Sequence, residues 1–240
     1  MSSRYVRFVA LAERLRREHP EVHDPIESIN AGRVLVDGVV ITNPEGLVHR
    51  HALISVSNTR PLRGILKLRA ALATFEVSAQ GCVAMDVGAS TGGFTTALIA
   101  AGAQRVYAID AGYGQLLGSL RQDTRVVNLE RTNLGALTRA IVPEPVDLVT
   151  IDVSYLALAY AVPQLEVVSF APGAVLIALV KPMYELGLSR PPSEASILEE
   201  AVRRAASGIE LASWTVRGRM QSPVRGTRGA VEFILWAQRR

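Results

Sequence analysis

The pattern of apolar and polar residues changes at about residue 60. From residue 65 onward, short apolar runs typical of buried strands alternate with stretches of helical spacing. The predicted elements are Ile65–Phe75, Val83–Val87, Thr95–Ala101, Arg105–Asp110, Val126–Glu130, Val146–Asp152, Ala174–Val180, Ile197–Ala206, Glu210–Val216 and Val231–Ala237. This alternation predicts an α/β fold over residues 65–240, with a mainly parallel, doubly wound sheet flanked by helices.

The first 58 residues form a separate unit by pattern. Helical spacing covers Val6–Arg17 and Pro25–Ala31, and two β-branched runs then flank Asp37-Gly38, a dipeptide typical of hairpin turns. Residues 59–64 contain Pro and Gly among polar residues, which predicts a linker. We therefore expect a small N-terminal α+β domain (1–58), a linker (59–64) and a larger C-terminal domain (65–240).

Lysine is rare in this chain. Only two of the 26 basic residues are lysine, Lys67 and Lys181, and the others are arginine. A desolvated lysine can release its proton, whereas arginine stays charged, so the two lysines are candidates for a chemical role. Chance retention is the alternative.

Charge and composition narrow the classes of function. The net charge of +4 and a pI near 9.6 permit a polyanionic partner without requiring one. Cys82 is the only cysteine, which excludes an intrachain disulfide, and no histidine has the spacing of a zinc site. Apolar runs such as Ala174–Val180 are far shorter than the roughly 20 residues of a membrane helix. We expect a cytoplasmic protein with no resident metal and no membrane partner.

A glycine-containing loop follows the predicted strand Val83–Val87, where an α/β sheet presents its ligands. Its spacing is not the Gly-x-Gly-x-x-Gly of dinucleotide-binding proteins, and an acid, Asp86, stands directly before it. A carboxylate there would repel a pyrophosphate but suit the cationic methionine moiety of S-adenosylmethionine. The residues of the predicted cofactor site at this strand end are Asp86, which precedes the loop, and the loop residues Gly88, Ala89, Ser90, Thr91 and Gly92.

Two further polar residues stand at the ends of the next two predicted strands. Asp110 offers acceptors to ribose hydroxyls, and Asn133 offers an amide to an adenine edge. Taken alone, each carboxylate is also explained as a helix cap or a solvated turn. Polar residues at three successive strand ends favour an S-adenosylmethionine site.

A family resemblance rests on the runs Asp86–Thr95, Val106–Leu116, Leu129–Asn133, Asp152–Tyr155 and Leu179–Pro182. They are similar to motifs of the TlyA-type, or hemolysin A-like, RNA methyltransferases. That family joins an S-four-like RNA-binding domain to an FtsJ-like methyltransferase domain, so the resemblance covers almost the whole chain. It implies a Rossmann-like sheet, S-adenosylmethionine as cofactor, and RNA, in particular ribosomal RNA, as partner.

The N-terminal unit resembles the S-four-like domain best over Ile29–Pro44. Such domains meet structured RNA mostly through its phosphates. Asp24 and Glu27 are acidic where members of that family tend to be basic. RNA binding is the expectation for this unit, with a dimerisation or packing module as the alternative.

FtsJ-like enzymes methylate ribose 2'-hydroxyls with a Lys-Asp-Lys-Glu set, which the resemblance places at Lys67, Asp152, Lys181 and Glu232. Strand ends on one edge of a sheet converge, so residues distant in sequence can meet there. Lys181 is the candidate base or hydroxyl-orienting group; Asp152 opposes its deprotonation, and both roles stay open. Lys67 and Glu232 are expected to position the nucleotide and the other side chains. The alternative is a buried ion-pair network without catalysis.

Near Glu232, four arginines are candidates for phosphate contacts: Arg217, Arg219, Arg225 and Arg228. A solvated basic loop is the alternative. The chain departs from the family at Leu62–Leu68, at Ala230 where asparagine is common, and at Leu186–Pro192, which is shorter than usual. These departures bear on substrate positioning more than on the cofactor.

The sequence therefore predicts an S-adenosylmethionine-dependent RNA 2'-O-methyltransferase acting on ribosomal RNA, and the resemblance implies cytidine ribose. A non-catalytic RNA-binding or ribosome-assembly protein that retains the fold is the alternative. The hemolysin name alone would suggest membrane lysis. The sequence shows neither a membrane segment nor a secretory signal, which argues against that activity. The pattern does not define the oligomeric state.

Overall fold

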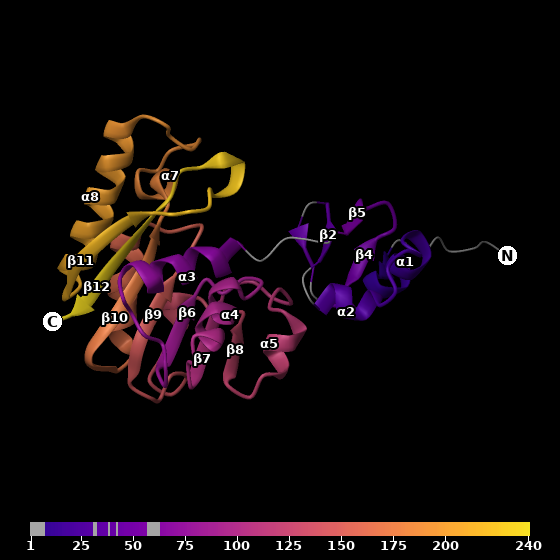
Figure 1. The fold of residues 1–240 in the computed structure, drawn as a ribbon, viewed down its shortest axis with the longest axis horizontal. Helices are drawn as coiled ribbons and strands as arrows, with labels where there is room; N and C mark the ends of the chain where they lie inside the picture. Colours follow the sequence, from indigo (N-terminus) through magenta and orange to yellow (C-terminus); the bar gives the residue numbers. More distant parts are fainter. Residues whose placement is uncertain (1–7, 31–32, 38, 42, 57–62) are drawn as a thin grey trace.

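The computed structural model describes residues 8–30, 33–37, 39–41, 43–56 and 63–240. Its elements fall into an N-terminal unit of short strands and two helices and a larger α/β unit (Figure 1). The N-terminal elements are β1 (Phe8–Ala10), α1 (Leu11–Glu18), α2 (Pro25–Asn30), β2 (Val34–Val36), β3 (Val39–Val40), β4 (Leu47–His49) and β5 (Ile54–Val56).

The N-terminal unit has a hydrophobic core of its own. Leu11, Leu15, Ile29 and Val34 are fully buried at its centre. Arg14, only 3% exposed, donates hydrogen bonds to the carbonyls of His49 and Ala52 and to Glu18. This buried guanidinium ties α1 to the segment between β4 and β5.

The predicted hairpin is confirmed, since β2 and β3 pair antiparallel with Val36 opposite Val39. The turn residue Gly38 and the flanking Gly32 and Ala31 lie outside the described residues. The single helix predicted over Val6–Arg17 is wrong at its start. Phe8–Ala10 forms β1, which pairs with β4, and α1 begins at Leu11; Val6 and Arg7 are not described. The prediction used only local spacing, which cannot reveal that Phe8–Ala10 pairs with residues about 40 positions later, Leu47–His49.

The larger unit holds a seven-stranded sheet of order β11-β12-β10-β9-β6-β7-β8. Strands β10, β9, β6, β7 and β8 run parallel, and β12 lies antiparallel between β10 and β11. The elements are α3 (Arg63–Thr74), β6 (Val83–Val87), α4 (Gly93–Ala100), β7 (Arg105–Asp110), α5 (Gly118–Gln122), β8 (Val126–Glu130), β9 (Val146–Ile151), α6 (Leu158–Ala161), β10 (Phe170–Val180), α7 (Pro182–Glu185), α8 (Ala195–Leu211), β11 (Trp214–Gln221) and β12 (Phe233–Arg239), with 3₁₀ turns at Leu134–Ala136, Val162–Val167 and Thr227–Gly229.

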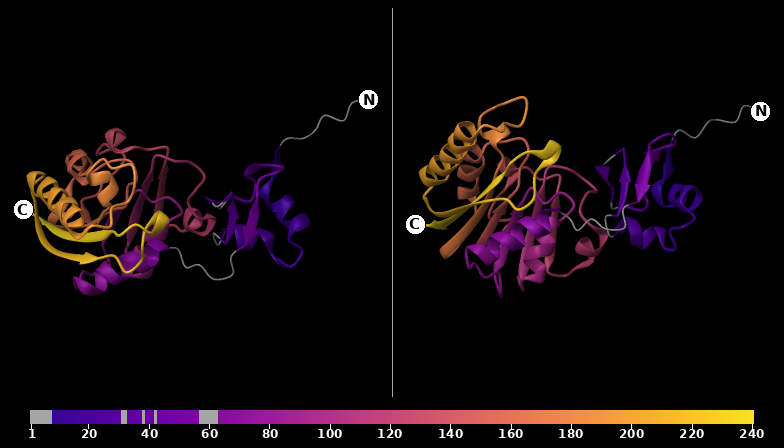
Figure 2. Two further views of the ribbon diagram at one scale, coloured as in Figure 1. Left: turned by 90° about the horizontal axis from the view of Figure 1, so that it is seen from above. Right: turned by 45° about the horizontal axis from the view of Figure 1, so that its top comes forward.

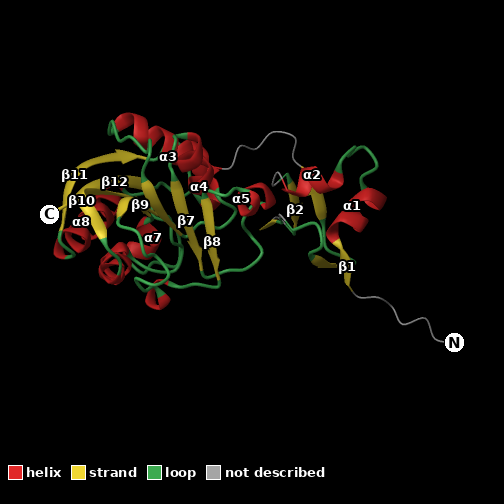
Figure 3. Ribbon diagram, turned by 90° about the horizontal axis from the view of Figure 1, so that it is seen from below, coloured by secondary structure: helices red, strands yellow, loops and turns green. Residues whose placement is uncertain are grey.

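Helices cover both faces of this sheet, as the views of Figure 2 and Figure 3 show, with α3 and α4 on one side and α6 and α8 on the other. Apolar residues of the strands alternate between the two cores. In β10, for example, Ile177 and Leu179 face the α3–α4 core, whereas Leu176 and Ala178 face the α6–α8 core. The predicted doubly wound, mainly parallel α/β fold is confirmed.

Two predicted boundaries are wrong. Glu210 and Leu211 belong to α8, which ends at Leu211, and not to a strand. Ser213 then adopts a left-handed φ of 63°, and β11 begins at Trp214. Residues 63 and 64, predicted as linker, open α3. A Cβ on Gly64 would lie only 3.1 Å from the Cα of Gly93 in α4, so these two glycines let the helices touch backbone to backbone.

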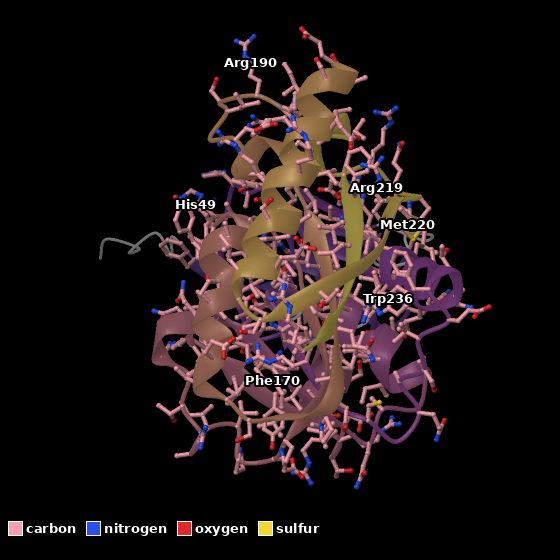
Figure 4. All side chains as sticks on the ribbon, turned by 90° about the vertical axis from the view of Figure 1, so that its left-hand side faces the viewer. His49, Phe170, Arg190, Arg219, Met220 and Trp236 are labelled. Carbon is pink, nitrogen blue, oxygen red and sulfur yellow. The ribbon has the colours of Figure 1, made fainter. Side chains whose placement is uncertain are left out.

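The carboxyl ends of the parallel strands and the start of the antiparallel β12 share one edge of the sheet, because Val180, the last residue of β10, pairs with Phe233, the first of β12. Figure 4 shows Arg190, which follows α7, at this end of the molecule and Phe170, the first residue of β10, at the opposite end. In the same view Trp236 of β12 lies on the α3 side, where its ring stacks on Phe75 at 5.7 Å. In the described part of the chain, no helix is both long and apolar enough to cross a membrane.

Candidate active site

A cavity of about 250 Å³ opens at the carboxyl ends of β6, β7, β8 and β9. We call it the β6–β9 cavity. Residues from the ends of all four strands, or from the loops that follow them, contribute to its wall. They are Val87, Gly88, Ser90, Ile109, Asp110, Ala111, Gln115, Thr132, Leu134, Asp152, Val153, Ser154 and Tyr155.

Asp110 connects two loops at the mouth of the cavity. Its Oδ2 accepts a hydrogen bond from the backbone N–H of Ser90 at 2.7 Å, and its Oδ1 accepts one from Gly112 at 2.6 Å. Each carboxylate oxygen has two lone pairs, so one acceptor position per oxygen remains for a ligand hydroxyl. The predicted role of Asp110 as a ribose acceptor fits this arrangement.

Glu130 holds the loop after β7 from the neighbouring strand. Its Oε1 accepts hydrogen bonds from the backbone N–H groups of Gln115 and Leu116 at 2.7 and 3.2 Å. Burial acts to raise the pKa of the Glu130 carboxyl, but the Asn128 amide and these backbone N–H groups outweigh it and lower the pKa. An ionised Glu130 thus fixes the loop that carries Gln115 into the cavity wall.

Asp86 lies under the glycine loop and not in the cavity wall. The carboxyl is fully buried and accepts hydrogen bonds from the hydroxyls of Thr95 at 2.6 Å and Thr150 at 2.9 Å. Burial raises its pKa to about 6 against the effect of these hydrogen bonds. In the pleat of β6, Asp86 shares the face of Ala84, which packs in the α3–α4 core, whereas Val87 on the other face reaches the cavity. Through these two hydrogen bonds, Asp86 of β6 connects that strand to β9 and to α4.

Gly88 marks the closest approach between the loop and β9. Its φ is +86°, and an added Cβ would fall 2.4 Å from the carbonyl oxygen of Asp152. Gly88 and Ala89 both donate backbone hydrogen bonds to Ile109, and Gly92, with φ +93°, precedes α4 against Leu120. Ala89, Thr91 and Gly92 shape the loop, and of the predicted loop residues only Gly88 and Ser90 line the cavity.

Asn133 is exposed and lies outside the cavity wall, between Thr132 and Leu134, which both line it. Its backbone begins the 3₁₀ turn Leu134–Ala136. The structure therefore brings the two neighbours of Asn133 to the cavity, and not Asn133 itself, which was the residue predicted from the sequence.

The four residues of the predicted Lys-Asp-Lys-Glu set form two ion pairs. Lys67 lies on the buried stripe of α3, and its Nζ is 2.6 Å from Oε2 of Glu232, with both side chains at least 93% buried. Glu232 directly precedes β12 and shares the pleat face of Ile234, which packs on α3. The antiparallel pairing of β12 with β10 therefore brings the Glu232 carboxylate next to Lys67 of α3.

Lys181 and Asp152 form the second pair at the ends of the neighbouring strands β10 and β9. Nζ of Lys181 is 2.5 Å from Oδ1 of Asp152, at an angle outside hydrogen-bond geometry, so the contact is an electrostatic ion pair. The same ammonium donates a hydrogen bond to Oγ of Ser154 at 2.7 Å. The two side chains are 14% and 22% exposed, so this pair, unlike that of Lys67, is reachable from solvent.

A second cavity, of about 340 Å³, adjoins Lys181, and we call it the β10–β12 cavity. Its wall consists of Ser154, Lys181, Pro182, Met183, Tyr184, Pro191, Pro192, Thr227, Arg228, Ala230, Val231 and Glu232. Ser154 is common to both cavities, and Asp152 lines the β6–β9 cavity while its partner Lys181 lines the other. The Asp152–Lys181 pair therefore stands at the junction of the two spaces.

Sequence reasoning did not select several residues that line these cavities, among them Gln115, Thr132, Ser154 and Tyr184. Gln115 and Ser154 stand inside the runs that carried the resemblance, and only their side-chain directions were missing. Closeness to Asp152 in sequence was the available signal for Ser154. Tyr184 and the proline pair 191–192 gave no signal, because their place depends on how the chain folds back after α7.

Comparison with known proteins agrees with this geometry. The model of the FtsJ-like methyltransferase family matches residues 61–239. The chain is 39% identical to the 16S/23S rRNA (cytidine-2'-O)-methyltransferase TlyA of Mycobacterium tuberculosis, over 88% of this chain and 81% of that protein. It is 29% identical to hemolysin A of Brachyspira hyodysenteriae, over 86% and 89%.

Solved structures give the same picture. A hemolysin candidate from Streptococcus thermophilus matches 97% of this chain and 88% of its own with a TM-score of 0.71 and 28% identity. One from Lactococcus lactis matches 74% and 88% with a TM-score of 0.70 and 31% identity. The predicted family resemblance is confirmed: this chain belongs to the FtsJ-like methyltransferase family.

Proposed function

We propose that this protein is an S-adenosylmethionine-dependent 2'-O-methyltransferase of ribosomal RNA that modifies cytidine ribose. One observation carries the proposal: Lys181, held by Asp152 and Ser154, stands where two cavities meet. A methyl transfer needs two binding spaces with a proton-handling group between them. The activity printed for the Mycobacterium tuberculosis relative supports the choice of RNA and cytidine.

The β6–β9 cavity has the acceptor groups that S-adenosylmethionine requires. Asp110 keeps free lone pairs for ribose hydroxyls, and the lack of a side chain at Gly88 lets the loop pack directly on the backbone of Asp152. The Asp152 carboxylate offers negative charge in the wall toward a sulfonium. When bound, S-adenosylmethionine supplies a methyl group activated by the positive charge on its sulfur. FtsJ-like methyltransferases use this cofactor.

The chain's own task is then to orient a ribose hydroxyl and take up its proton. Nζ of Lys181 stands in the wall of the β10–β12 cavity with Asp152 and Ser154 as its partners. In its ammonium form, paired with the Asp152 carboxylate, Lys181 donates a hydrogen bond to the hydroxyl oxygen. As a neutral amine, Lys181 accepts the hydroxyl proton. The two roles differ in their dependence on charge, which a lysine-to-arginine substitution separates.

The β10–β12 cavity fits the target nucleotide. Tyr184, Pro191 and Pro192 supply apolar walls, and Arg228 supplies a cation at the rim. Arg228 is exposed with a φ of 57° and lies in the 3₁₀ turn Thr227–Gly229 before β12. Of the other arginines predicted to meet phosphates, Arg219 pairs with Glu199, and Arg225 donates to the carbonyl of Gly229. We assign Arg228 the first phosphate contact.

Residues 1–58 are proposed as an RNA-binding domain, the residues from 59 up to the start of α3 at Arg63 as a linker, and the residues from α3 to 240 as the methyltransferase domain. The separate core of the N-terminal unit and its β2–β3 hairpin support this division. A ribosomal RNA substrate places the work of the enzyme in the cytoplasm. Ribosomal RNA or ribosomal subunits are the proposed partners.

The proposal is tested by incubating the purified protein with ribosomal RNA or subunits and S-adenosylmethionine carrying a labelled methyl group. We expect label on a cytidine ribose. Lys181→Ala and Asp152→Ala should abolish transfer, while calorimetry still detects cofactor binding by Lys181→Ala. Glu166→Gln, in an ion pair with Arg239 away from both cavities, is the control. Unchanged turnover in both site variants contradicts the catalytic assignment, and absent cofactor binding in the parent protein favours the non-catalytic RNA-binding alternative.

A further inference from the structure

Glu185 is a buried acid that the reaction outlined above does not use. It ends α7, the helical turn that begins directly after Lys181, and is only 7% exposed. Its Oε1 accepts a hydrogen bond from the backbone N–H of Leu158 at 3.0 Å, while Oε2 is buried without a hydrogen-bond partner among the described residues. Burial raises the pKa of this carboxyl to about 7. Burying a carboxyl with one unpaired oxygen costs free energy of desolvation, so the position of Glu185 needs an explanation.

The cations near Glu185 are engaged elsewhere. The cavity of about 350 Å³ beside it presents Tyr160 of α6 and Glu200, Arg203 and Arg204 of α8. Both arginines form ion pairs with Glu200. Glu185 is therefore bound chiefly through the single hydrogen bond to Leu158, which makes its contact with that backbone the feature to explain.

This hydrogen bond spans the two segments that carry the catalytic groups. Leu158 is the first residue of α6 and ends the irregular segment that starts at Asp152 and includes Ser154. On the other side, the backbone N–H of Glu185 donates to the carbonyl of Lys181 at 3.1 Å. One end of the 152–158 segment is thus held by the Asp152–Lys181 pair and the other by Glu185, only four residues beyond Lys181.

We propose that Glu185 is a positioning residue: its carboxyl fixes the 152–158 segment against α7 so that Ser154 and Asp152 stay in place around Lys181. This inference rests on the proposed methyl transfer. Ser154 is exposed, and the backbone hydrogen bonds found for this segment among the described residues lie at its two ends. The N–H of Asp152 donates to the carbonyl of Val87, and the carbonyl of Ala157 accepts from α6. Loss of the far tether would therefore let Ser154 move relative to Nζ. A displacement of about 1 Å at a reacting group costs roughly 10²-fold in rate.

The test compares Glu185→Gln, which keeps a carbonyl acceptor for Leu158, with Glu185→Ala and Glu185→Leu, which remove it. Glu185→Leu refills the space and serves if the alanine variant does not fold. We expect kcat to fall roughly 10²-fold in the variants without an acceptor. Glu185→Gln should keep most of the parent kcat, and cofactor Kd should change by less than about twofold (~0.4 kcal/mol) in all three. Glu200→Gln, in the same cavity, is the matched control.

Hydrogen exchange of the backbone amides of residues 154–158 is read in parallel, because it does not require activity. Faster exchange in Glu185→Leu but not in Glu185→Gln supports the tether even if the parent protein proves unable to methylate RNA. Parent-like kcat in Glu185→Leu, or equal loss in Glu185→Gln and Glu185→Leu, overturns the inference. Failure of the parent protein itself in the transfer assay overturns the proposed function instead, so the two failures are distinguishable.

Discussion

Nζ of Lys67 lies 2.6 Å from Oε2 of Glu232, and 165 residues separate the two in the chain. Both side chains are almost completely buried between α3 and the start of β12. Burying two charges is costly, and a buried pair contributes little net stability compared with well-packed apolar residues. The pair is therefore better explained by what it does for the β10–β12 cavity, whose wall includes Glu232.

Replacing one member of this ion pair should destabilise the fold more than replacing both members with apolar residues. Lys67→Met leaves Glu232 buried without a counterion, and we expect a loss of about 3–5 kcal/mol in the free energy of unfolding, measured in urea. The double variant Lys67→Met/Glu232→Leu should recover most of that loss, yet fail to transfer methyl groups. Additive costs in the double variant, or a double variant with full activity, would show that the pair has no such role.

Arginine should not replace Lys181. Lys181→Arg keeps the positive charge beside Asp152 but cannot release a proton at neutral pH. If Lys181 acts as a base, kcat falls by about 10²–10⁴-fold with little change in cofactor affinity. Arg125→Lys, at a surface pair with Asp123, is the control for the exchange of one cation for another. Full activity in Lys181→Arg would leave only the orienting role.

Gly88 should tolerate no side chain. Gly88→Ala combines a left-handed φ with a Cβ 2.4 Å from the Asp152 carbonyl, whereas Gly81, with φ +72°, has nothing within 4 Å of its added Cβ. Gly81→Ala should cost only the conformational strain of about 1–2 kcal/mol. Gly88→Ala should cost more in thermal stability and also weaken S-adenosylmethionine binding, measured by calorimetry. Equal effects of the two substitutions would contradict the close approach.

Asp86 should make stability fall as pH rises. Its pKa is about 6 in the fold against an ordinary value of 3.8, so the folded protein binds the proton more tightly than the unfolded chain. The resulting stabilisation is full below about pH 4 and is lost as pH rises through 6, which amounts to about 3 kcal/mol. The unfolding free energy of the parent minus that of Asp86→Asn, measured in urea, should therefore be larger at pH 4 than at pH 8 by about that amount.

Asp123 provides the opposite sign as a control. The side chain and backbone N–H groups of Arg125 lower the pKa of the Asp123 carboxyl, so its contribution is present at neutral pH and lost as pH falls. Asp123→Asn should remove that loss and leave the Asp86-linked change between about pH 4 and pH 6 untouched. A parent-minus-variant difference for Asp86→Asn that does not vary between pH 4 and 8 would contradict the raised pKa.

The sequence by itself determined the α/β class, the position of the glycine-containing loop after β6 and the family, and the resemblance to that family supplied the prediction of the Lys-Asp-Lys-Glu set. Each is written locally: apolar runs of strand length, glycines at a strand end, and short motifs such as Asp152–Tyr155. The sequence pattern around Asp86 predicted a cofactor contact, whereas the structure buries this side chain on the face of the sheet that α3 and α4 cover. Local sequence does not say which helix will cover a given face of a strand. It also missed β1, whose partner strand is distant in the chain.

Only the tertiary structure decided how the four catalytic candidates pair and what supports them. Sequence distance says nothing about whether Lys67 meets Glu232 or Asp152; the antiparallel return of β12 beside β10 settles it by bringing Glu232 to the buried stripe of α3. The same packing places Ser154 between two cavities and Glu185 behind the 152–158 segment. These relations arise from long-range strand order and burial, which no window of the chain contains.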